Sequence, residues 1–258
     1  MYAVVDPSTG DVVKEYPTAT DEQMEQALAS ASRAYRQWSK NSTVDERAAL
    51  IRRVGQLHTE RKDELAAIIQ REMGKPLDQS VGEVEFSAAI YEFYADNAAK
   101  FLADEPIELL DGEGSALVRR SAVGVLLGIM PWNYPYYQVA RFAGPNLVLG
   151  NTIVLKHAPQ CPESAAAIAQ IFLDAGYPEG AYVNVYATNE QIAETLRGRD
   201  GRQGSEAVSG GQHPLCELVE ELVVDVPGDD ETLGGVAGLT GVLEPAGDGG
   251  FNGRVHVI

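Results

Sequence analysis

The stretch VGVLLGIMPWNYP, residues 123–135, decides the fold. Its first half is apolar apart from two glycines, which is typical of a strand buried on both faces. The pattern that follows predicts a helix at 138–149, a strand at 152–155, a helix at 164–175 and a strand at 182–186. Strands that alternate with helices in this way predict part of a doubly wound parallel (Rossmann-like) sheet in an α/β fold. A ligand crevice is then expected beyond the carboxyl ends of the strands.

The residues before this stretch predict a hairpin followed by helices. Two capping-box pairs, Thr20 with Gln23 and Thr43 with Glu46, mark the starts of two helices. Gly74, followed by Lys and Pro, marks the end of a third helix. The expected elements are strands at 2–5 and 12–16, helices after Thr20 and Thr43, helices at 63–73 and from 77 past 94, and a strand at 116–120.

The composition changes near residue 196. Residues 201–258 hold 13 of the chain's 26 glycines and no lysine, and their charges are mostly acidic. Such a segment cannot bury enough apolar surface to offset the entropy of ordering it. We therefore expect an N-terminal helical segment with the hairpin (1–118), a partial dinucleotide-binding domain (119–197) and an irregular acidic tail (198–258).

Charge and composition exclude several classes of protein. A net charge of −18 argues against a nucleic-acid partner, because phosphates would be repelled. The longest apolar run is too short to cross a bilayer, and the N-terminus does not resemble a signal peptide. The two cysteines, Cys161 and Cys216, have no metal-ligand spacing around them. We expect a cytoplasmic protein with no membrane or metal partner.

Two residues near the predicted strand ends could carry chemistry. Asn133 lies in a loop between two prolines, so its amide would be held in place and could donate to a developing oxyanion. The alternative is an ordinary turn residue. Lys156 ends a buried strand, where its ammonium could reach a phosphate or ribose. The alternative for Lys156 is a surface lysine whose stem covers apolar neighbours.

The motifs PWNYP (131–135) and VLKHAP (154–159) together resemble the aldehyde dehydrogenase superfamily. The upstream EMGKP (72–76) and the helix at 91–99 are also similar, so that the resemblance covers about 2–196. It implies that Asn133 supplies the side-chain donor of the oxyanion hole. It also implies that one cofactor-contacting set lines the nicotinamide side and another lies near the adenosine ribose. The first set is Met130, Pro131, Trp132 and Asn133, and the second is Lys156, His157, Ala158 and Pro159.

The resemblance also indicates which cofactor and substrate to expect. Relatives that prefer NAD commonly have a glutamate three residues after the lysine, where this chain has Pro159. Without that carboxylate a ribose 2′-phosphate is not repelled, so NADP is expected rather than NAD. Arg141 occupies a position where an arginine is typical of the succinate-semialdehyde branch and binds the far carboxylate of the substrate. It lies eight residues after Asn133, about two helical turns, so both could face one crevice. A surface salt bridge is the alternative role for Arg141.

The residues that family chemistry requires next are absent. That chemistry uses a cysteine nucleophile in a Gly-Gln-x-Cys motif and a glutamate base in Glu-Leu-Gly-Gly, and the sequence contains neither motif. Cys216 has the wrong spacing after Gly211-Gln212, and its acidic neighbours would raise a thiol pKa. We expect a truncated chain, with a frameshift after about Leu196 as one explanation.

These observations leave two functional hypotheses. The first is NADP-dependent oxidation of an aldehyde, namely succinate semialdehyde to succinate, with this chain nearly inactive on its own. The alternative is a non-catalytic nucleotide-binding or subunit-like remnant. Intact family members are expected to form homo-oligomers, and the missing motifs leave open whether this chain does.

Overall fold

The structure of the chain, a computed structural model, describes residues 1–108 and 116–197, and the side chains of all of these except 197. Chain contacts divide the described residues into two units, Met1–Leu102 with Ser121–Ile192, and a second one that includes β3, β4 and the residues after Ile192 that the structure describes. The predicted tail at 198–258, including Cys216, lies outside the described residues. The proposed division at 118 and 197 stays a prediction.

The larger unit begins with the predicted hairpin. Strand β1 (Tyr2–Val5) pairs antiparallel with β2 (Val12–Tyr16). The turn between them contains Gly10 at φ 80, a left-handed conformation that glycine adopts without steric cost. Tyr2 and Val4 are buried, so β1 holds the hairpin against the rest of the unit.

Four helices follow at the predicted places. They are α1 (Asp21–Gln37), α2 (Val44–Glu60), α3 (Lys62–Met73) and α4 (Leu77–Phe101), with a short 3₁₀ helix, η1 (Ser39–Asn41), after α1. Both predicted capping boxes are present, on Thr20 and on Thr43. Helix α3 ends at Gly74, whose φ of 71 permits the left-handed cap.

The predicted parallel sheet is confirmed. Its elements are β5 (Val125–Ile129), α5 (Pro135–Leu149), β6 (Thr152–Lys156), α6 (Pro162–Asp174) and β7 (Tyr182–Asn184). The strand order is β5-β6-β7, and both pairs are parallel. Helices α5 and α6 begin earlier than predicted, because Pro135 and Pro162 occupy the first turn, where proline fits without losing a hydrogen bond.

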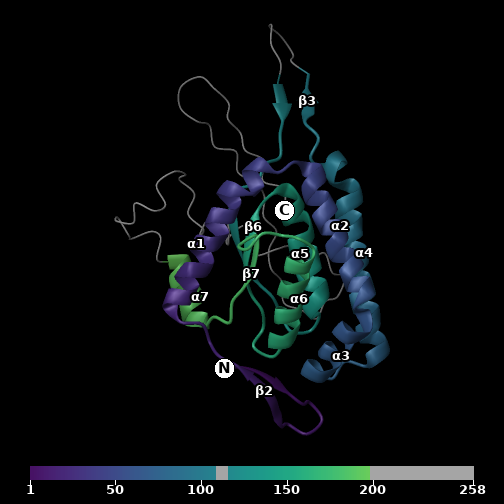
Figure 1. The fold of residues 1–258 in the computed structure, drawn as a ribbon, viewed down its shortest axis with the longest axis vertical. Helices are drawn as coiled ribbons and strands as arrows, with labels where there is room; N and C mark the ends of the chain where they lie inside the picture. The colour runs from purple at the N-terminus through teal and green to yellow at the C-terminus, as the bar shows by residue number, and fades with distance from the viewer. Residues whose placement is uncertain (109–115, 198–258) are drawn as a thin grey trace. The chain divides into compact units, whose positions relative to one another are not determined.

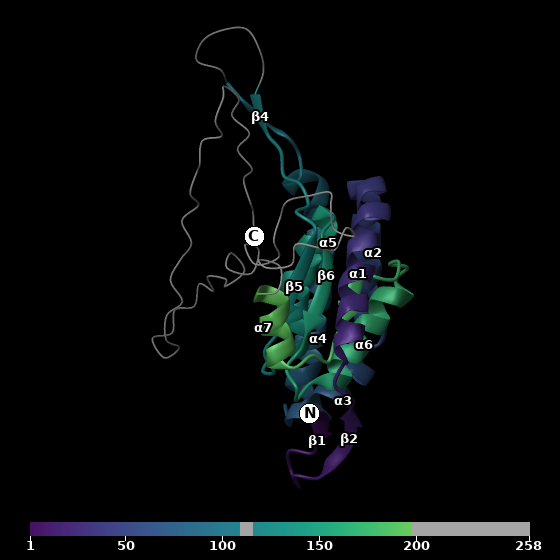
Figure 2. The same cartoon turned by 90° about the vertical axis from the view of Figure 1, so that its left-hand side faces the viewer.

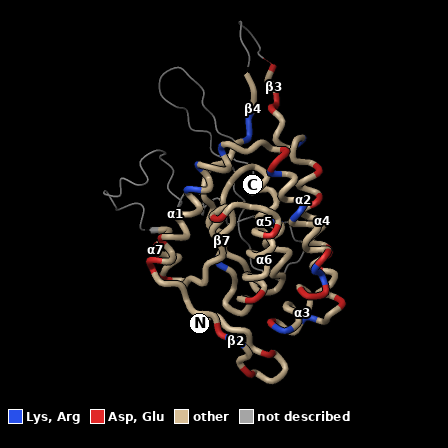
Figure 3. Tube along the Cα trace, in the orientation of Figure 1, with Lys and Arg blue, Asp and Glu red and all other residues tan. Residues whose placement is uncertain are grey.

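Burial on both faces was predicted for 123–129 and holds only in part. Residues 126–128 are buried, but Ile129 is 51% exposed because it lies at the carboxyl edge of the sheet. The three strands contain one charged residue, Lys156, whereas α2, α3 and α4 carry charged residues of both signs along their length (Figure 3).

Helices cover the sheet on both faces. α1 lies on one side of the strands, where Thr152 Oγ1 donates to the Ala31 carbonyl over 3.0 Å, and α5 and α6 lie on the other (Figures 1 and 2). α2 and α4 pack outside α5, so that one apolar core extends from the sheet to the N-terminal helices.

The remaining elements were less well predicted. The strand expected at 116–120 is β4 (Ala116–Val118), which pairs antiparallel with β3 (Glu105–Ile107) in the second unit. β3 was not predicted, because its short sequence Glu-Pro-Ile is exposed and has no apolar alternation. α7 (Asn189–Arg197) was also not predicted. Within the described residues, no helix is both long and apolar enough to span a bilayer.

Candidate functional site

The two loops that carry the predicted site residues leave the sheet at the same edge. β5 and β6 are parallel neighbours, and their last residues, Ile129 and Lys156, are register partners. The Met130 amide donates to the Lys156 carbonyl over 3.0 Å, which joins the two strand ends. The structure therefore places 130–133 and 156–159 side by side, as the parallel pattern predicts.

The loop that carries Asn133 is exposed but its backbone is held. Trp132 is 50% exposed and Tyr134 47%, and Asn133 is exposed as well. The Asn133 carbonyl accepts a hydrogen bond from Lys75 Nζ over 3.0 Å. Within the described residues, the side-chain amide of Asn133 has no hydrogen-bond partner, so it is available to a ligand at the sheet edge. The two prolines predicted a held loop, and the structure adds a lysine that holds it.

Lys75 belongs to a buried ion pair that sequence analysis missed. Its ammonium pairs with Glu83, and the two side chains are 9% and 1% exposed. Glu83 Oε1 also accepts from the backbone amides of Tyr136 (2.9 Å) and Tyr137 (3.3 Å), at the start of α5. The EMGKP motif contains Lys75, but no local pattern indicates that Glu83, on the next helix, is its partner.

Lys156 is a buried ammonium at the end of β6. The residue is 6% exposed, and burial lowers the pKa of its side chain. Its Nζ lies 5.8 Å from the centroid of the Tyr2 ring. In the described part of the chain, this ammonium group forms no ion pair or hydrogen bond. A cation that is desolvated and has no anionic partner is suited to an anionic ligand.

His157 ties the two loops together. Its Nδ1 accepts from the Ala158 amide over 2.9 Å, so Nε2 carries the proton and donates to the Pro135 carbonyl over 3.0 Å. Burial lowers the pKa of this imidazole to about 4, so it is neutral at physiological pH. His157 is fully buried, which makes its side chain a link between loops rather than an exposed contact surface. Pro159 is exposed, and its carbonyl accepts from the Ala3 amide.

The argument that placed Arg141 beside Asn133 needs correction. α5 begins at Pro135, so Asn133 precedes the helix and helical spacing does not relate the two residues. Arg141 is half-buried, and its guanidinium carbon lies 5.3 Å from the centroid of the Tyr137 ring. Tyr137 in turn stacks on Phe86 at 5.3 Å. Arg141 therefore belongs to an aromatic cluster on α4 and α5, and a salt bridge from Arg141 is not seen in the described residues.

Cys161 lies behind the Asn133 loop. It is fully buried at the start of α6, and its thiol is 3.6 Å from the Trp132 carbonyl. Burial raises the pKa of the thiol, and the neighbouring Glu72 and Glu83 raise it further. Such a thiol is a poor nucleophile. Among the described residues, no group of three or more His, Cys, Asp or Glu side chains could hold a metal ion.

Comparison with known proteins identifies the family. The model of the aldehyde dehydrogenase family matches residues 1–203, most of the chain. This chain belongs to the aldehyde dehydrogenase family. The two motifs that suggested it, PWNYP and VLKHAP, are the two loops at the carboxyl edge of the sheet.

Individual aldehyde dehydrogenases match over much of this chain. It is 41% identical over 239 residues to a succinate-semialdehyde dehydrogenase [NADP(+)] of Deinococcus radiodurans, and this match covers 89% of the chain and 48% of that protein. A succinate-semialdehyde dehydrogenase [NADP(+)] 1 of Mycobacterium ulcerans is 35% identical over 224 residues, which is 86% of this chain and 48% of that protein. The chain thus spans about half the length of the curated relatives it matches.

A solved aldehyde dehydrogenase shares the fold. The crystal structure of succinic semialdehyde dehydrogenase from Streptococcus pyogenes, in complex with NADP⁺, superposes with a TM-score of 0.73 at 34% identity. The match covers 76% of this chain and 43% of that one. The fold prediction is therefore confirmed for the part of the chain that the structure describes.

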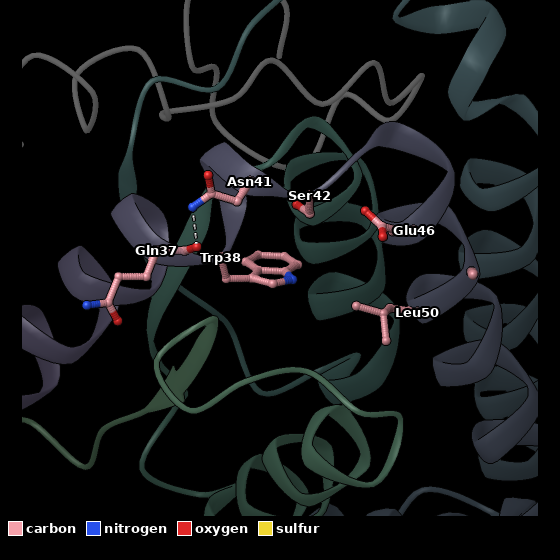
Figure 4. A pocket seen from close by; sticks show the side chains of 7 residues that line it. Gln37, Trp38, Asn41, Ser42, Glu46 and Leu50 are labelled. Atoms are coloured by element: carbon pink, nitrogen blue, oxygen red, sulfur yellow. Dashed lines mark hydrogen bonds between the residues drawn. The ribbon is translucent and has the colours of Figure 1, made fainter.

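A separate pocket lies away from the aldehyde dehydrogenase motifs (Figure 4). It is an open depression of ≈ 530 Å³ where α1, η1 and α2 meet. Its lining residues are Gln37, Trp38, Asn41, Ser42, Glu46, Ala49 and Leu50. Glu46 is the ionisable group among them, and it is already engaged in capping α2 through Thr43. None of the predicted site residues lines this pocket.

Proposed function

We propose that this chain forms the cofactor-binding part of an NADP-dependent aldehyde dehydrogenase that oxidises succinate semialdehyde to succinate. The observation that carries the proposal is the ammonium of Lys156, which is buried at the carboxyl end of β6 next to the loop of Asn133 and forms no ion pair with any residue that the structure describes. The names of the relatives from Deinococcus and Mycobacterium support the substrate and the cofactor.

The residues at this edge fit a dinucleotide phosphate. Lys156 offers a cation that no anion among residues 1–108 and 116–196 pairs with, and Pro159 stands where a carboxylate would oppose a 2′-phosphate. Lys156 donates to the adenosine ribose and its phosphate. Met130, Pro131 and Trp132 line the nicotinamide side, while Ala158 and Pro159 contact the adenosine side. His157 keeps the two loops in register.

Asn133 and Arg141 act on the substrate. NADP, when bound, supplies the acceptor for the hydride that leaves the aldehyde carbon. The amide of Asn133 donates to the carbonyl oxygen as negative charge develops there, and one such donor lowers the barrier by roughly 2.7–4 kcal/mol. The guanidinium of Arg141, which lies over the Tyr137 ring, binds the far carboxylate of succinate semialdehyde.

The nucleophile and the base of the reaction do not belong to this part. Cys161 is buried with a raised thiol pKa, and the sequence contains neither Gly-Gln-x-Cys nor Glu-Leu-Gly-Gly. Loss of a nucleophile typically costs on the order of 10⁶-fold in turnover, so these 258 residues alone bind cofactor without measurable turnover. The lack of these two motifs in the sequence also favours a second candidate, a non-catalytic nucleotide-binding subunit.

Calorimetry and an absorbance assay test the proposal. The 258-residue chain is titrated with NADP and, separately, with NAD, and NADPH formation is then followed with succinate semialdehyde. Tighter binding of NADP than of NAD supports the cofactor assignment. Addition of a chain that carries the missing motifs separates the two candidates: NADPH formation supports the enzyme part, and its absence supports the non-catalytic subunit. No binding of either dinucleotide would contradict both.

A further inference from the structure

The Lys75–Glu83 ion pair contacts the Asn133 loop on both sides of Pro135. Before Pro135, Lys75 Nζ donates to the Asn133 carbonyl and lies 3.8 Å from the centroid of the Tyr134 ring. After it, Glu83 accepts from the first amides of α5. α5 has no side-chain cap from its own N-cap residue, Tyr134. The ion pair therefore supplies both the cap of the helix and the anchor of the loop.

Other contacts hold the two ends of this loop, and the Tyr134 carbonyl accepts the first helical hydrogen bond of α5 from the Gln138 amide over 3.0 Å. Met130 is tied to β6 and the Pro135 carbonyl to His157. Between them, the Trp132 carbonyl accepts from the Cys161 thiol, which is a weak donor. The bond from Lys75 to the Asn133 carbonyl fixes the plane of the peptide that follows Asn133. That plane restricts the backbone at Asn133 and with it the direction of its Cα–Cβ bond.

Stability alone does not explain a charged pair at this position. Apolar residues of similar volume stabilise a core as well as, or better than, a buried ion pair. The charged pair instead provides three directional contacts with one loop: a donor to a carbonyl, an acceptor for two amides, and a cation above an aromatic ring.

We infer that Lys75 and Glu83 are positioning residues that set the direction of the Asn133 amide, a role that rests on the proposed function. They act through the backbone of 133–137. The ion pair is a clamp whose two halves, on the α3–α4 turn and on α4, reach the loop from the N-terminal helices. The site thus depends on a packed helical layer as well as on the sheet.

Hydrogen exchange on the full chain tests the clamp with three variants. Lys75→Met removes the cation at similar length, Lys75→Arg keeps it, and the double variant Lys75→Met/Glu83→Gln removes both charges. We expect the amides of Tyr136 and Tyr137, which donate to Glu83, to exchange at least about 10-fold faster in Lys75→Met and in the double variant. Lys75→Arg should restore most of the protection. Amides of α1 serve as the internal control and should not change.

The double variant separates positioning from stability. Because it leaves no buried charge unpaired, its Tm should lie closer to wild type than that of Lys75→Met, while its loop still exchanges fast. Loop exchange that recovers together with the Tm would overturn the proposal, as would unchanged exchange in both variants.

NADP titration of the same proteins keeps the two proposals apart. Weaker NADP binding that follows the exchange rates supports the clamp as part of the site. Fast loop exchange in a chain whose wild type binds no NADP would overturn the proposed function and still support the clamp on the Asn133 loop.

Discussion

The two crossover helices of the sheet begin alike and are completed differently. α5 and α6 both start with a proline, and neither is capped by its own N-cap residue. Each is capped by a buried glutamate from another helix, α5 by Glu83 and α6 by Glu72. Glu72 accepts from the Glu163 amide (2.5 Å), the Ser164 amide (3.2 Å) and the Ser164 hydroxyl (2.6 Å). Glu83 has Lys75 as a cationic partner, whereas the third partner of Glu72 is a hydroxyl.

The two caps therefore differ in their properties. The Glu72 cap is a carboxyl group with a raised pKa, whereas the Glu83 cap also contacts the Asn133 loop through Lys75. Burial raises the pKa of Glu72 to about 7, and its hydrogen bonds only partly oppose this. Around Glu83, the added cation extends the cap to the Asn133 carbonyl. The remote caps therefore have one structural purpose in common, and the α5 cap has a second one, at the site.

The largest expected difference between the two caps is in the free energy of unfolding that is lost when each glutamate is replaced by glutamine. Glu83→Gln leaves the buried Lys75 ammonium without its anion, and we expect it to lower the free energy of unfolding by about 3 kcal/mol or more. Glu72→Gln strands no charge, so we expect a loss of about 1 kcal/mol at pH 8. Urea denaturation followed by circular dichroism measures both. Equal losses would show that the Lys75 pairing adds nothing to the α5 cap.

The pH dependence of stability should distinguish Glu72 next. Because its pKa in the folded state, about 7, exceeds the ordinary 4.5, the folded chain holds a proton that the unfolded chain releases between these values. Stability from this group is full below pH 4.5 and is lost as the pH rises to 7. As the pH falls from 7 to 4.5, the free energy of unfolding of wild type should therefore rise relative to that of Glu72→Gln, by at most about 3 kcal/mol.

Comparing wild type with Glu72→Gln also cancels the pH dependence of two histidines, whose contributions to stability have the opposite sign. Burial lowers the pKa of both His58 and His157 to about 4, so stability from each is present above the ordinary 6.5 and is lost as the pH falls toward 4. Both histidines occur in wild type and variant, so their contributions cancel in the difference. A difference that stays constant from pH 7 to 4.5 would contradict the raised pKa of Glu72.

A local cap should matter least. The Thr43 hydroxyl caps α2 by accepting from the Glu46 amide. In return, the exposed Glu46 carboxylate accepts from the Thr43 amide. Thr43→Ala should therefore cost about 1 kcal/mol in the free energy of unfolding and leave NADP binding unchanged. Thermal unfolding measures the first and calorimetry the second. A loss as large as that in Glu83→Gln would erase the distinction between local and remote caps.

The same distinction explains what the sequence could predict. Thr20 and Thr43 cap their helices through partners three residues away, so the pattern is visible in the chain. The hairpin, the four helices and the strand–helix alternation are likewise local or periodic features. Family motifs placed Asn133 and Lys156 on neighbouring loops, and the structure agrees on that placement.

What could not be predicted depends on contacts distant in sequence. Lys75 reaches Asn133 over 58 positions, and Glu83 reaches Tyr136 over 53, with no local signal for either contact. The sequence predicted that the two loops are neighbours, but not that the buried His157 side chain joins them through the Pro135 carbonyl. The spacing argument for Arg141 does not apply because Asn133 lies before the first residue of α5, Pro135, so the turns of the helix do not relate the two residues.

The most direct test of the central claim is calorimetric titration of NADP into wild type, Lys156→Met and Lys100→Met. Lys100 is an exposed lysine at the end of α4 and serves as the matched control for loss of one positive charge. Because a hydrogen bond to a charged group contributes about 1.5–3 kcal/mol, Lys156→Met should weaken NADP binding by about 10- to 100-fold. Lys100→Met should bind as wild type does. Equal affinities for wild type and Lys156→Met would contradict a cofactor site at the carboxyl edge of β5 and β6.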